Sequence, residues 1–186
     1  MIRMKTINVA FGKFNPITCE HEKLLDLLYA NEGDHRVYIF GTISRYTKVM
    51  RMIDISRFYP KMEIVSTEDN PYDAIVNLCL SPYERINIFC GIGDDGIQKG
   101  RSEGASYNEL TRLMKNIHKK VPEAPIEKIV LRMNPRGRIS GSLVREYIWA
   151  HGPLIGTSMK ATKEMLHSKY TEENIQYLSM LFSESD

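Results

Sequence analysis

Two segments of the sequence place phosphate-binding side chains where a helix is expected to begin. The first follows an apolar run at residues 7–11 and reads Gly12-Lys13-Phe14-Asn15-Pro16-Ile17-Thr18-Cys19-Glu20-His21. If Thr18 caps the helix, His21 lies about one turn further on, at the same edge of the helix. Backbone N–H groups and the helix dipole make this end an anion site, where an imidazole donates hydrogen bonds and Lys13 adds a mobile positive charge. The segment therefore predicts a phosphate site.

The second segment repeats this arrangement near residue 140. It reads Asn134-Pro135-Arg136-Gly137-Arg138-Ile139-Ser140-Gly141-Ser142-Leu143-Val144-Arg145. Ser142 is expected to cap a helix that places Arg145 one turn in, where its planar guanidinium can bind two phosphate oxygens. Ser140 supplies another hydroxyl, and Arg136 and Arg138 either add charge for phosphate or form a solvated basic loop. Either segment alone suits an ordinary capped helix, but the two together predict a triphosphate site.

Apolar runs that alternate with helical patterns predict the elements that position these segments. Strand-like runs lie at residues 7–11, 37–40, 62–65, 85–90 and 126–133, and helical patterns lie at 24–28, 47–59, 74–80, 107–120, 142–150 and 158–182. The alternation predicts the α/β class, with a Rossmann-like, doubly wound parallel sheet whose ligands bind beyond the carboxyl ends of the strands. We expect one domain, with residues 1–152 forming its body and residues 153–186 a helical C-terminal extension.

Composition limits the function classes. The 186 residues are 42% hydrophobic and 26% charged, as in a globular domain, and a net charge of +2 without a basic run argues against a nucleic-acid partner. The three cysteines show no disulfide or zinc spacing, so no metal ligand is assigned. No apolar stretch approaches the roughly 20 residues of a membrane span, and residues 1–5 do not resemble a signal peptide. We expect a cytoplasmic protein without a membrane partner.

The two segments resemble the (H/T)xGH and ISxSxxR signatures of the nucleotidylyltransferase superfamily. Thr18 and His21 match the first signature, and Ile139 to Arg145 match the second, so the resemblance covers roughly residues 6–152. The glycine that usually precedes the second histidine is Glu20 here. Lys13 and the Ser-Gly-Ser run at 140–142 look like archaeal-type nicotinamide mononucleotide adenylyltransferases and phage-encoded cytidylyltransferase-like proteins. The Pro-Ile-Thr run at 16–18 instead looks like phosphopantetheine adenylyltransferase.

The resemblance implies a mechanism and a set of site residues. The acceptor's phosphate attacks the α-phosphorus of a nucleoside triphosphate in line, and pyrophosphate leaves without a covalent enzyme intermediate. His21 is the implied catalytic residue, assisted by Thr18 and Lys13, while Mg²⁺ arrives mainly on the triphosphate. Asp94, in a Gly-x-Asp segment after another strand, either contacts a ribose or forms an ordinary turn. The implied nucleotide- and phosphate-binding residues are Gly12, Phe14, Ser140, Ser142, Arg145, Asp94 and Arg136.

The resemblance also implies the substrates. We expect ATP, or CTP, and a phosphorylated small-molecule acceptor, with adenylyl transfer to nicotinamide mononucleotide, which gives NAD, as the leading hypothesis. The alternatives are adenylyl or cytidylyl transfer to phosphopantetheine or to a sugar or alcohol phosphate. Glu20 keeps open a further alternative, a nucleotide-binding protein without turnover. A homo-oligomer is expected from the superfamily, and the host cytoplasm is the expected location if the chain is phage-encoded.

Overall fold

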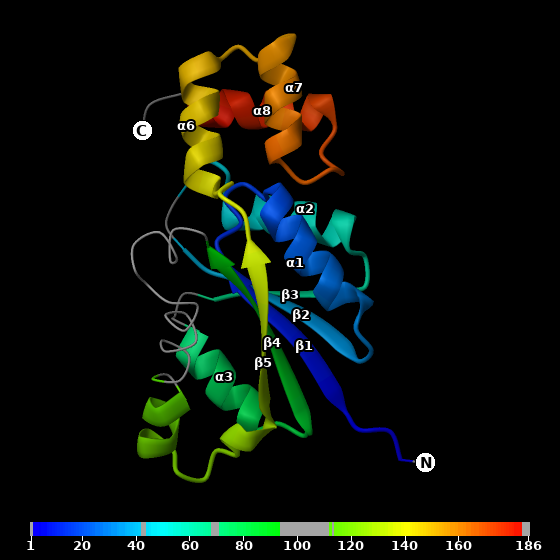
Figure 1. Ribbon diagram of the computed structural model, residues 1–186, viewed down its shortest axis with the longest axis vertical. Coiled ribbons are helices and arrows are strands. Elements are labelled where there is room, and N and C mark those ends of the chain that lie inside the picture. Colours follow the sequence, from blue (N-terminus) through cyan, green and yellow to red (C-terminus); the bar gives the residue numbers. More distant parts are fainter. Residues whose placement is uncertain (1, 42–43, 68–70, 94–111, 113, 184–186) are drawn as a thin grey trace.

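Five parallel strands form a single sheet. The computed structural model describes residues 2–41, 44–67, 71–93, 112 and 114–183. The strands are β1 (Thr6–Gly12), β2 (Asp34–Ile39), β3 (Glu63–Ser66), β4 (Arg85–Gly93) and β5 (Ile129–Arg136). Their order, β3-β2-β1-β4-β5, turns in opposite directions from β1, so β1 and β4 meet at the switch point of a doubly wound sheet (Figure 1). The predicted fold class is therefore confirmed.

Helices cover both faces of the sheet. They are α1 (Cys19–Ala30), α2 (Lys48–Phe58), α3 (Pro71–Leu80), the short 3₁₀ helix η1 (Ile126–Lys128), α6 (Gly141–His151), α7 (Thr157–Met165) and α8 (Glu172–Ser183), and residues 114–120 are also helical. Successive strand residues point to opposite faces. Ala10 of β1 therefore packs into the core with α1 and α2, whereas Val9 packs into the core with α3.

Helix α1 has well-defined ends. Thr18 caps its start, and its last turn closes with a hydrogen bond from Asn31 N–H to the carbonyl of Leu28. Gly33 then turns the chain into β2 with a φ of 116°, and a Cβ there would lie 2.5 Å from the carbonyl oxygen of Thr6. Only glycine fits this turn. The short connection sets α1 directly against the sheet, which places its N-terminus beyond the carboxyl end of β1.

Two boundaries differ from the sequence prediction. Strand β5 continues through Pro135 to Arg136, where a loop was expected from residue 134. Its position at the sheet edge tolerates a proline, because only one side of an edge strand must donate to the sheet. The C-terminal extension is not one helix but two, α7 and α8, because residues 166–171 leave the helix and pack on α1 and α2.

The break between α7 and α8 contacts the first predicted phosphate segment. Leu166 pairs with Thr18 in an isolated antiparallel bridge, and His167 N–H donates to the carbonyl of Ile17 over 3.0 Å. Ile17 N–H donates in turn to the hydroxyl of Tyr170 over 3.4 Å. Figure 1 shows α6, α7 and α8 together beyond the end of the sheet toward which β5 points. The C-terminal extension thus supports the loop that leads into α1.

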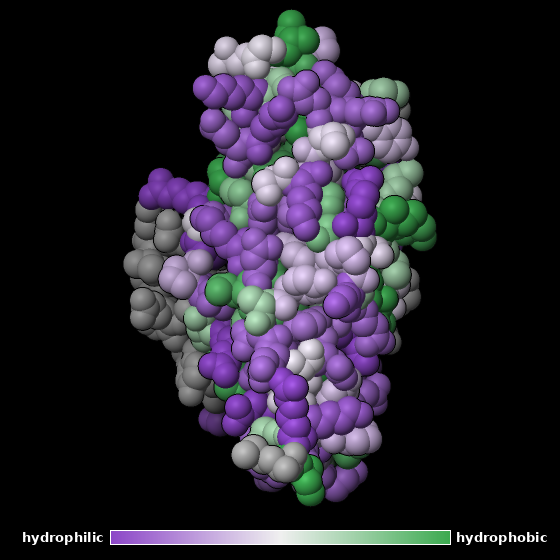
Figure 2. All heavy atoms as spheres, turned by 90° about the vertical axis from the view of Figure 1, so that its right-hand side faces the viewer, coloured by the Kyte–Doolittle hydropathy of each residue, from purple (hydrophilic) through white to green (hydrophobic). Residues whose placement is uncertain are grey.

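The face in Figure 2 is largely hydrophilic, with hydrophobic residues in small separate groups. Hydrophobic side chains scattered in this way are usual on soluble domains and need no partner to explain them. None of the helices within the described part of the chain is long and apolar enough to cross a membrane.

Candidate functional site

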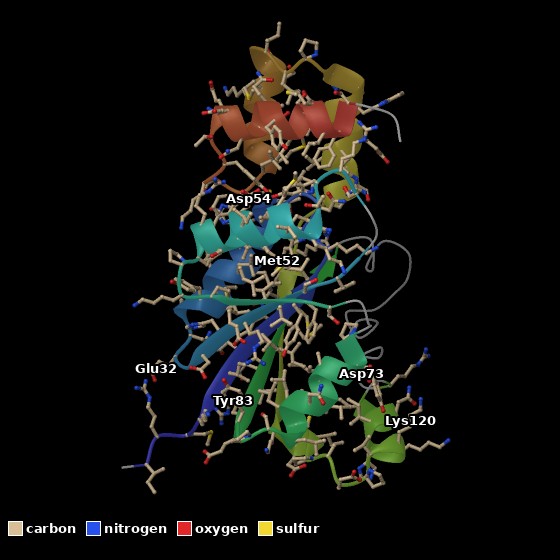
Figure 3. All side chains as sticks on the ribbon, turned by 180° about the vertical axis from the view of Figure 1, so that it is seen from behind. Glu32, Met52, Asp54, Asp73, Tyr83 and Lys120 are labelled. Atoms are coloured by element: carbon tan, nitrogen blue, oxygen red, sulfur yellow. The ribbon has the colours of Figure 1, made fainter. Side chains whose placement is uncertain are left out.

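A cavity of about 1330 Å³ lies at the switch point of the sheet. It is lined by the carboxyl ends of β1, β4 and β5 and by the first turns of α1 and α6. It extends to the side of α3, where Asp73 and Lys120 contribute to its wall, away from Asp54 of α2 (Figure 3). Ligand pockets commonly hold roughly 300–1,000 Å³. The volume therefore suits a nucleotide together with a second ligand.

Thr18 caps the first helix as predicted, with His21 one turn further on. Thr18 Oγ1 accepts a hydrogen bond from His21 N–H over 3.3 Å, and His21 Nδ1 accepts one from Thr18 N–H over 3.0 Å. The two residues therefore form a reciprocal capping box. Because Nδ1 accepts, the neutral imidazole carries its hydrogen on Nε2. The ring of Phe14 lies 4.8 Å from the imidazole and helps to fix its orientation. His21 lines the cavity, whereas Thr18 is fully buried behind it.

The environment of His21 keeps its ring neutral. Burial, followed by the positive charge of Arg136, lowers the pKa of His21 to about 4. The neutral imidazole is thus a hydrogen-bond donor through Nε2 rather than a cation. Such a donor can stabilise charge that develops on a phosphate oxygen. The positive charge needed to bind an anion comes from lysine and arginine side chains around it.

The low pKa of His21 predicts a pH-dependent stability. The unfolded ring takes up a proton near pH 6.5, whereas the folded ring stays neutral down to about pH 4. Acidification through this window therefore favours unfolding, and His21 alone removes up to about 3 kcal/mol of the free energy of unfolding. Urea unfolding at several pH values between 7 and 4 measures the loss. His21→Asn is expected to lose clearly less over the same window, and equal losses would contradict the assignment.

The second helix N-terminus corrects one expectation. Helix α6 begins at Gly141, and Ser140 is its N-cap, with Ser140 Oγ accepting from Leu143 N–H over 3.2 Å. The prediction that Ser142 caps this helix is wrong. Ser142 instead lies in the first turn, exposed, where its hydroxyl accepts from Arg145 Nη2 over 3.2 Å. Ser140 and Ser142 both line the cavity.

Arg145 joins the two helix N-termini. Its Nη1 donates a hydrogen bond to the carbonyl oxygen of Asn15 in the first segment. The backbone of Gly141 packs against the same carbonyl, because a Cβ on Gly141 would lie 2.6 Å from it. The guanidinium was expected to bind two phosphate oxygens. In the structure its Nη1 and Nη2 donate to Asn15 and Ser142, so it fixes the distance between the segments as well as supplying charge.

The other predicted phosphate residues line the same cavity. Gly12 ends β1, and a Cβ there would lie 2.8 Å from the Phe14 ring. Phe14 is buried and has a φ of 51°, an unusual conformation for a residue other than glycine. Lys13 is exposed, and its side chain packs against the backbone of Gly41, where a Cβ would lie 2.8 Å from Lys13 Cγ. Arg136 ends β5 with its side chain against Gly91. All four residues contribute to the wall of the cavity.

Arg51 does not line the cavity but supports the first segment from the core side, a contact that the sequence prediction did not include. It is 1% exposed on α2, and its Nη1 donates to the carbonyl oxygen of Lys13. Its Nη2 is buried and has no hydrogen-bond partner among the described residues. Burying an arginine that has no carboxylate as an ion-pair partner lowers the free energy of unfolding. The buried face of α2 consists of Arg51, Ile55 and Phe58, at i, i+4 and i+7, so helical spacing could have identified Arg51.

Asp94, the predicted ribose contact, lies outside the described residues. Trp149 is 66% exposed on α6. Tyr147 stacks on His151 with ring centroids 4.0 Å apart. Within the described part of the chain, no three His, Cys, Asp or Glu side chains are grouped as a metal site requires.

Comparisons with known proteins define what this fold is similar to. Neither protein-family models nor curated proteins give a match. Among solved structures, nicotinic acid mononucleotide adenylyltransferase of Plasmodium falciparum complexed with APC has a TM-score of 0.54 and 21% identity, over 95% of this chain and 98% of that chain. Its complex with NaAD has a TM-score of 0.51 and 20% identity, with the same coverage.

A bacterial structure gives the same result. A putative nicotinate-nucleotide adenylyltransferase from Vibrio parahaemolyticus has a TM-score of 0.55 and 15% identity, and the match covers 98% of each chain. The alignment therefore spans the sheet, both helix N-termini and the C-terminal extension. Sequence identity at this level carries no residue roles. This chain thus has the Rossmann-like fold found in these nicotinate-nucleotide adenylyltransferases.

Proposed function

We propose that this protein is a nucleotidylyltransferase that transfers the adenylyl group of ATP to a pyridine mononucleotide and releases pyrophosphate. One observation carries the proposal. The first turns of α1 and α6 line one cavity, through Glu20 and His21 and through Ser140 to Ser142, and Arg145 links the two segments through Asn15. Helix N-termini with basic side chains bind phosphate groups, and two of them side by side suit a triphosphate.

The proposed reaction uses positioning and charge. The acceptor's phosphate attacks the α-phosphorus in line, the bond to the bridging oxygen of pyrophosphate breaks, and pyrophosphate carries away its negative charge. His21 Nε2–H donates to an oxygen whose charge grows in the transition state. Lys13 and Arg136, both on the cavity wall, offset the charge of the triphosphate. Magnesium enters as part of the substrate MgATP, because this ion gives up its waters reluctantly.

The choice of acceptor is supported by the names of the structural neighbours. The neighbours are named a nicotinic acid mononucleotide adenylyltransferase and a putative nicotinate-nucleotide adenylyltransferase, whereas the family resemblance of the sequence implied nicotinamide mononucleotide. The two acceptors differ only in the carboxylate or amide of the ring. The wall near α3, with Asp73 and Lys120, lies across the cavity from the phosphate segments and is the proposed position of this ring. Asp94 remains a proposed ribose contact, and a cytoplasmic homo-oligomer remains a prediction.

A coupled assay tests the proposed function. Each nucleoside triphosphate is incubated with magnesium and, in turn, nicotinamide mononucleotide, nicotinic acid mononucleotide, phosphopantetheine and a sugar or alcohol phosphate. We expect pyrophosphate only with ATP and a pyridine mononucleotide, together with the matching dinucleotide by chromatography. The ratio of kcat/KM for the acid and the amide then identifies the acceptor.

Other outcomes of this assay are equally informative. Pyrophosphate with CTP, or only with a different acceptor, would replace the proposed substrates and keep the reaction class. Triphosphate binding by calorimetry without turnover on any pair would identify a nucleotide-binding protein. Absence of both binding and turnover would contradict the proposed function as a whole.

A further inference from the structure

We propose that Glu20 is a positioning residue that ties the two phosphate-binding helix N-termini together. Its role deepens the proposed function and rests on it. Glu20 lies in the first turn of α1, immediately before His21, and is 9% exposed. The superfamily that the sequence resembles usually has glycine here, and glycine has no side chain with which to make such a link. The tie is therefore a property of this chain.

The contacts of Glu20 cross between segments far apart in the sequence. Its Oε2 accepts a hydrogen bond from Gly137 N–H over 2.8 Å, and its Oε1 accepts one from Lys23 Nζ over 2.9 Å. Gly137 lies in the connection between β5 and α6, three residues before the cap of α6. A Cβ on Gly137 would lie 2.6 Å from Glu20 Oε1, so the carboxylate is seated directly against this backbone.

A carboxylate beside a phosphate site repels the phosphate unless nearby hydrogen-bond donors and positive charges compensate its negative charge. Burial alone would raise the pKa of Glu20, but the hydrogen bonds from Lys23 and Gly137 and the charge of Arg136 leave it below its usual value. Glu20 is therefore ionised at neutral pH. Its position in the first turn of α1 is also favoured by the helix dipole. The carboxylate occupies one N–H group of the β5–α6 connection and leaves the first turns of α1 and α6 to the triphosphate.

The tie complements the link made by Arg145. Arg145 reaches from α6 back to Asn15, whereas Glu20 reaches from α1 forward to Gly137. The two links thus join the first and second segments at different points. When phosphate-binding groups are displaced by even a small distance, they stabilise the transition state much less and the reaction slows. The structure thus assigns to Glu20 the alignment of His21 with the phosphate groups on α6.

Three substitutions at position 20 separate the effect of side-chain length from the effect of the negative charge. Glu20→Ala removes both, Glu20→Asp keeps the charge but is one methylene too short, and Glu20→Gln keeps a carbonyl oxygen that can accept from Gly137 N–H. We expect Glu20→Ala and Glu20→Asp to raise the dissociation constant for MgATP about tenfold, as loss of a hydrogen bond to a charged group implies. Glu20→Gln is expected to stay within about threefold of the wild type. Lys23→Met removes the ion pair and leaves the bond to Gly137, and because Lys23 also lines the cavity it serves as the control for the exchange measurement alone.

Two measurements decide the proposal. Calorimetry gives the MgATP affinity, and amide hydrogen exchange at Gly137 reports the tie without any nucleotide. Exchange at Gly137 is expected to quicken at least tenfold in the Ala and Asp variants and to change little in Glu20→Gln and Lys23→Met. Unchanged exchange would overturn the tie, and tighter ATP binding by Glu20→Ala would show that the carboxylate competes with phosphate. If the wild type binds no triphosphate, the proposed function fails, while the exchange result still decides whether the tie exists.

Discussion

Substitution of His21 by alanine is expected to lower kcat for adenylyl transfer by roughly 100- to 1,000-fold, the usual loss when a positioned donor to a transition-state oxygen is removed. The ring is neutral, because burial and Arg136 lower its pKa to about 4, and Nδ1 is committed to Thr18 N–H. Nε2–H is therefore oriented before the substrate arrives. A donor that acts mainly in the transition state changes kcat more than it changes the KM for ATP.

The stability of the His21 variant must be separated from its activity. Thr18 Oγ1 still accepts from the backbone N–H of residue 21, so α1 keeps half of its capping box. Thermal unfolding is expected to show a loss of about 1 kcal/mol, as for one hydrogen bond. His151→Ala is the matched control, because His151 is exposed at the end of α6. Turnover by His21→Ala close to that of the control would show that the mechanism is wrong.

The neutrality of His21 also has a consequence for the pH profile of catalysis. In the free protein the ring keeps its Nε2 hydrogen at every pH above about 4. We therefore attribute no change of activity between pH 6 and 8 to titration of this residue. The hydrogen-bond donor is equally present on both sides of pH 6.5, where an unperturbed histidine would gain a charge.

Local sequence patterns predicted the features that depend on neighbouring residues. Thr18 caps α1 because a hydroxyl three residues before His21 is close enough to its backbone in any helix that begins there. The parallel sheet follows from apolar runs that alternate with helical patterns. The cap of α6 was ambiguous, because Ser140 and Ser142 stand two residues apart and either can begin a helix. Packing of Gly141 against the Asn15 carbonyl is consistent with the earlier start.

The spacing of residues along the sequence could not predict the contacts between distant segments. Glu20 meets Gly137 across 117 positions, and Arg145 meets Asn15 across 130. No local pattern encodes either pair, because both depend on how β1 and β5 are placed by the sheet. The break at residues 166–171 is similar, since Leu166 leaves its helix to pair with Thr18. Such tertiary contacts override local helical preference.

Substitution of Arg145 by methionine is expected to raise the KM for ATP by roughly 100-fold. Methionine fills much of the same volume but donates neither to Asn15 nor to Ser142, and hydrogen bonds from a charged group are worth about 1.5–3 kcal/mol each. The substitution also removes a positive charge beside the α6 N-terminus. Arg145→Lys keeps the charge without the planar fork, so we expect an intermediate KM. Steady-state kinetics with ATP as the varied substrate and calorimetric MgATP binding measure both changes.

The pattern of kcat and KM distinguishes Arg145 from His21. Arg145 holds the first segment in place before any bond breaks, so its loss weakens the ground-state complex as well as the transition state and appears largely in KM. Arg132→Met is the matched control, because Arg132 is an exposed arginine of β5. A fall in kcat with unchanged ATP affinity in Arg145→Met would mean that Arg145 acts on the departing pyrophosphate alone. Its hydrogen bond to Asn15 would then be incidental to substrate binding.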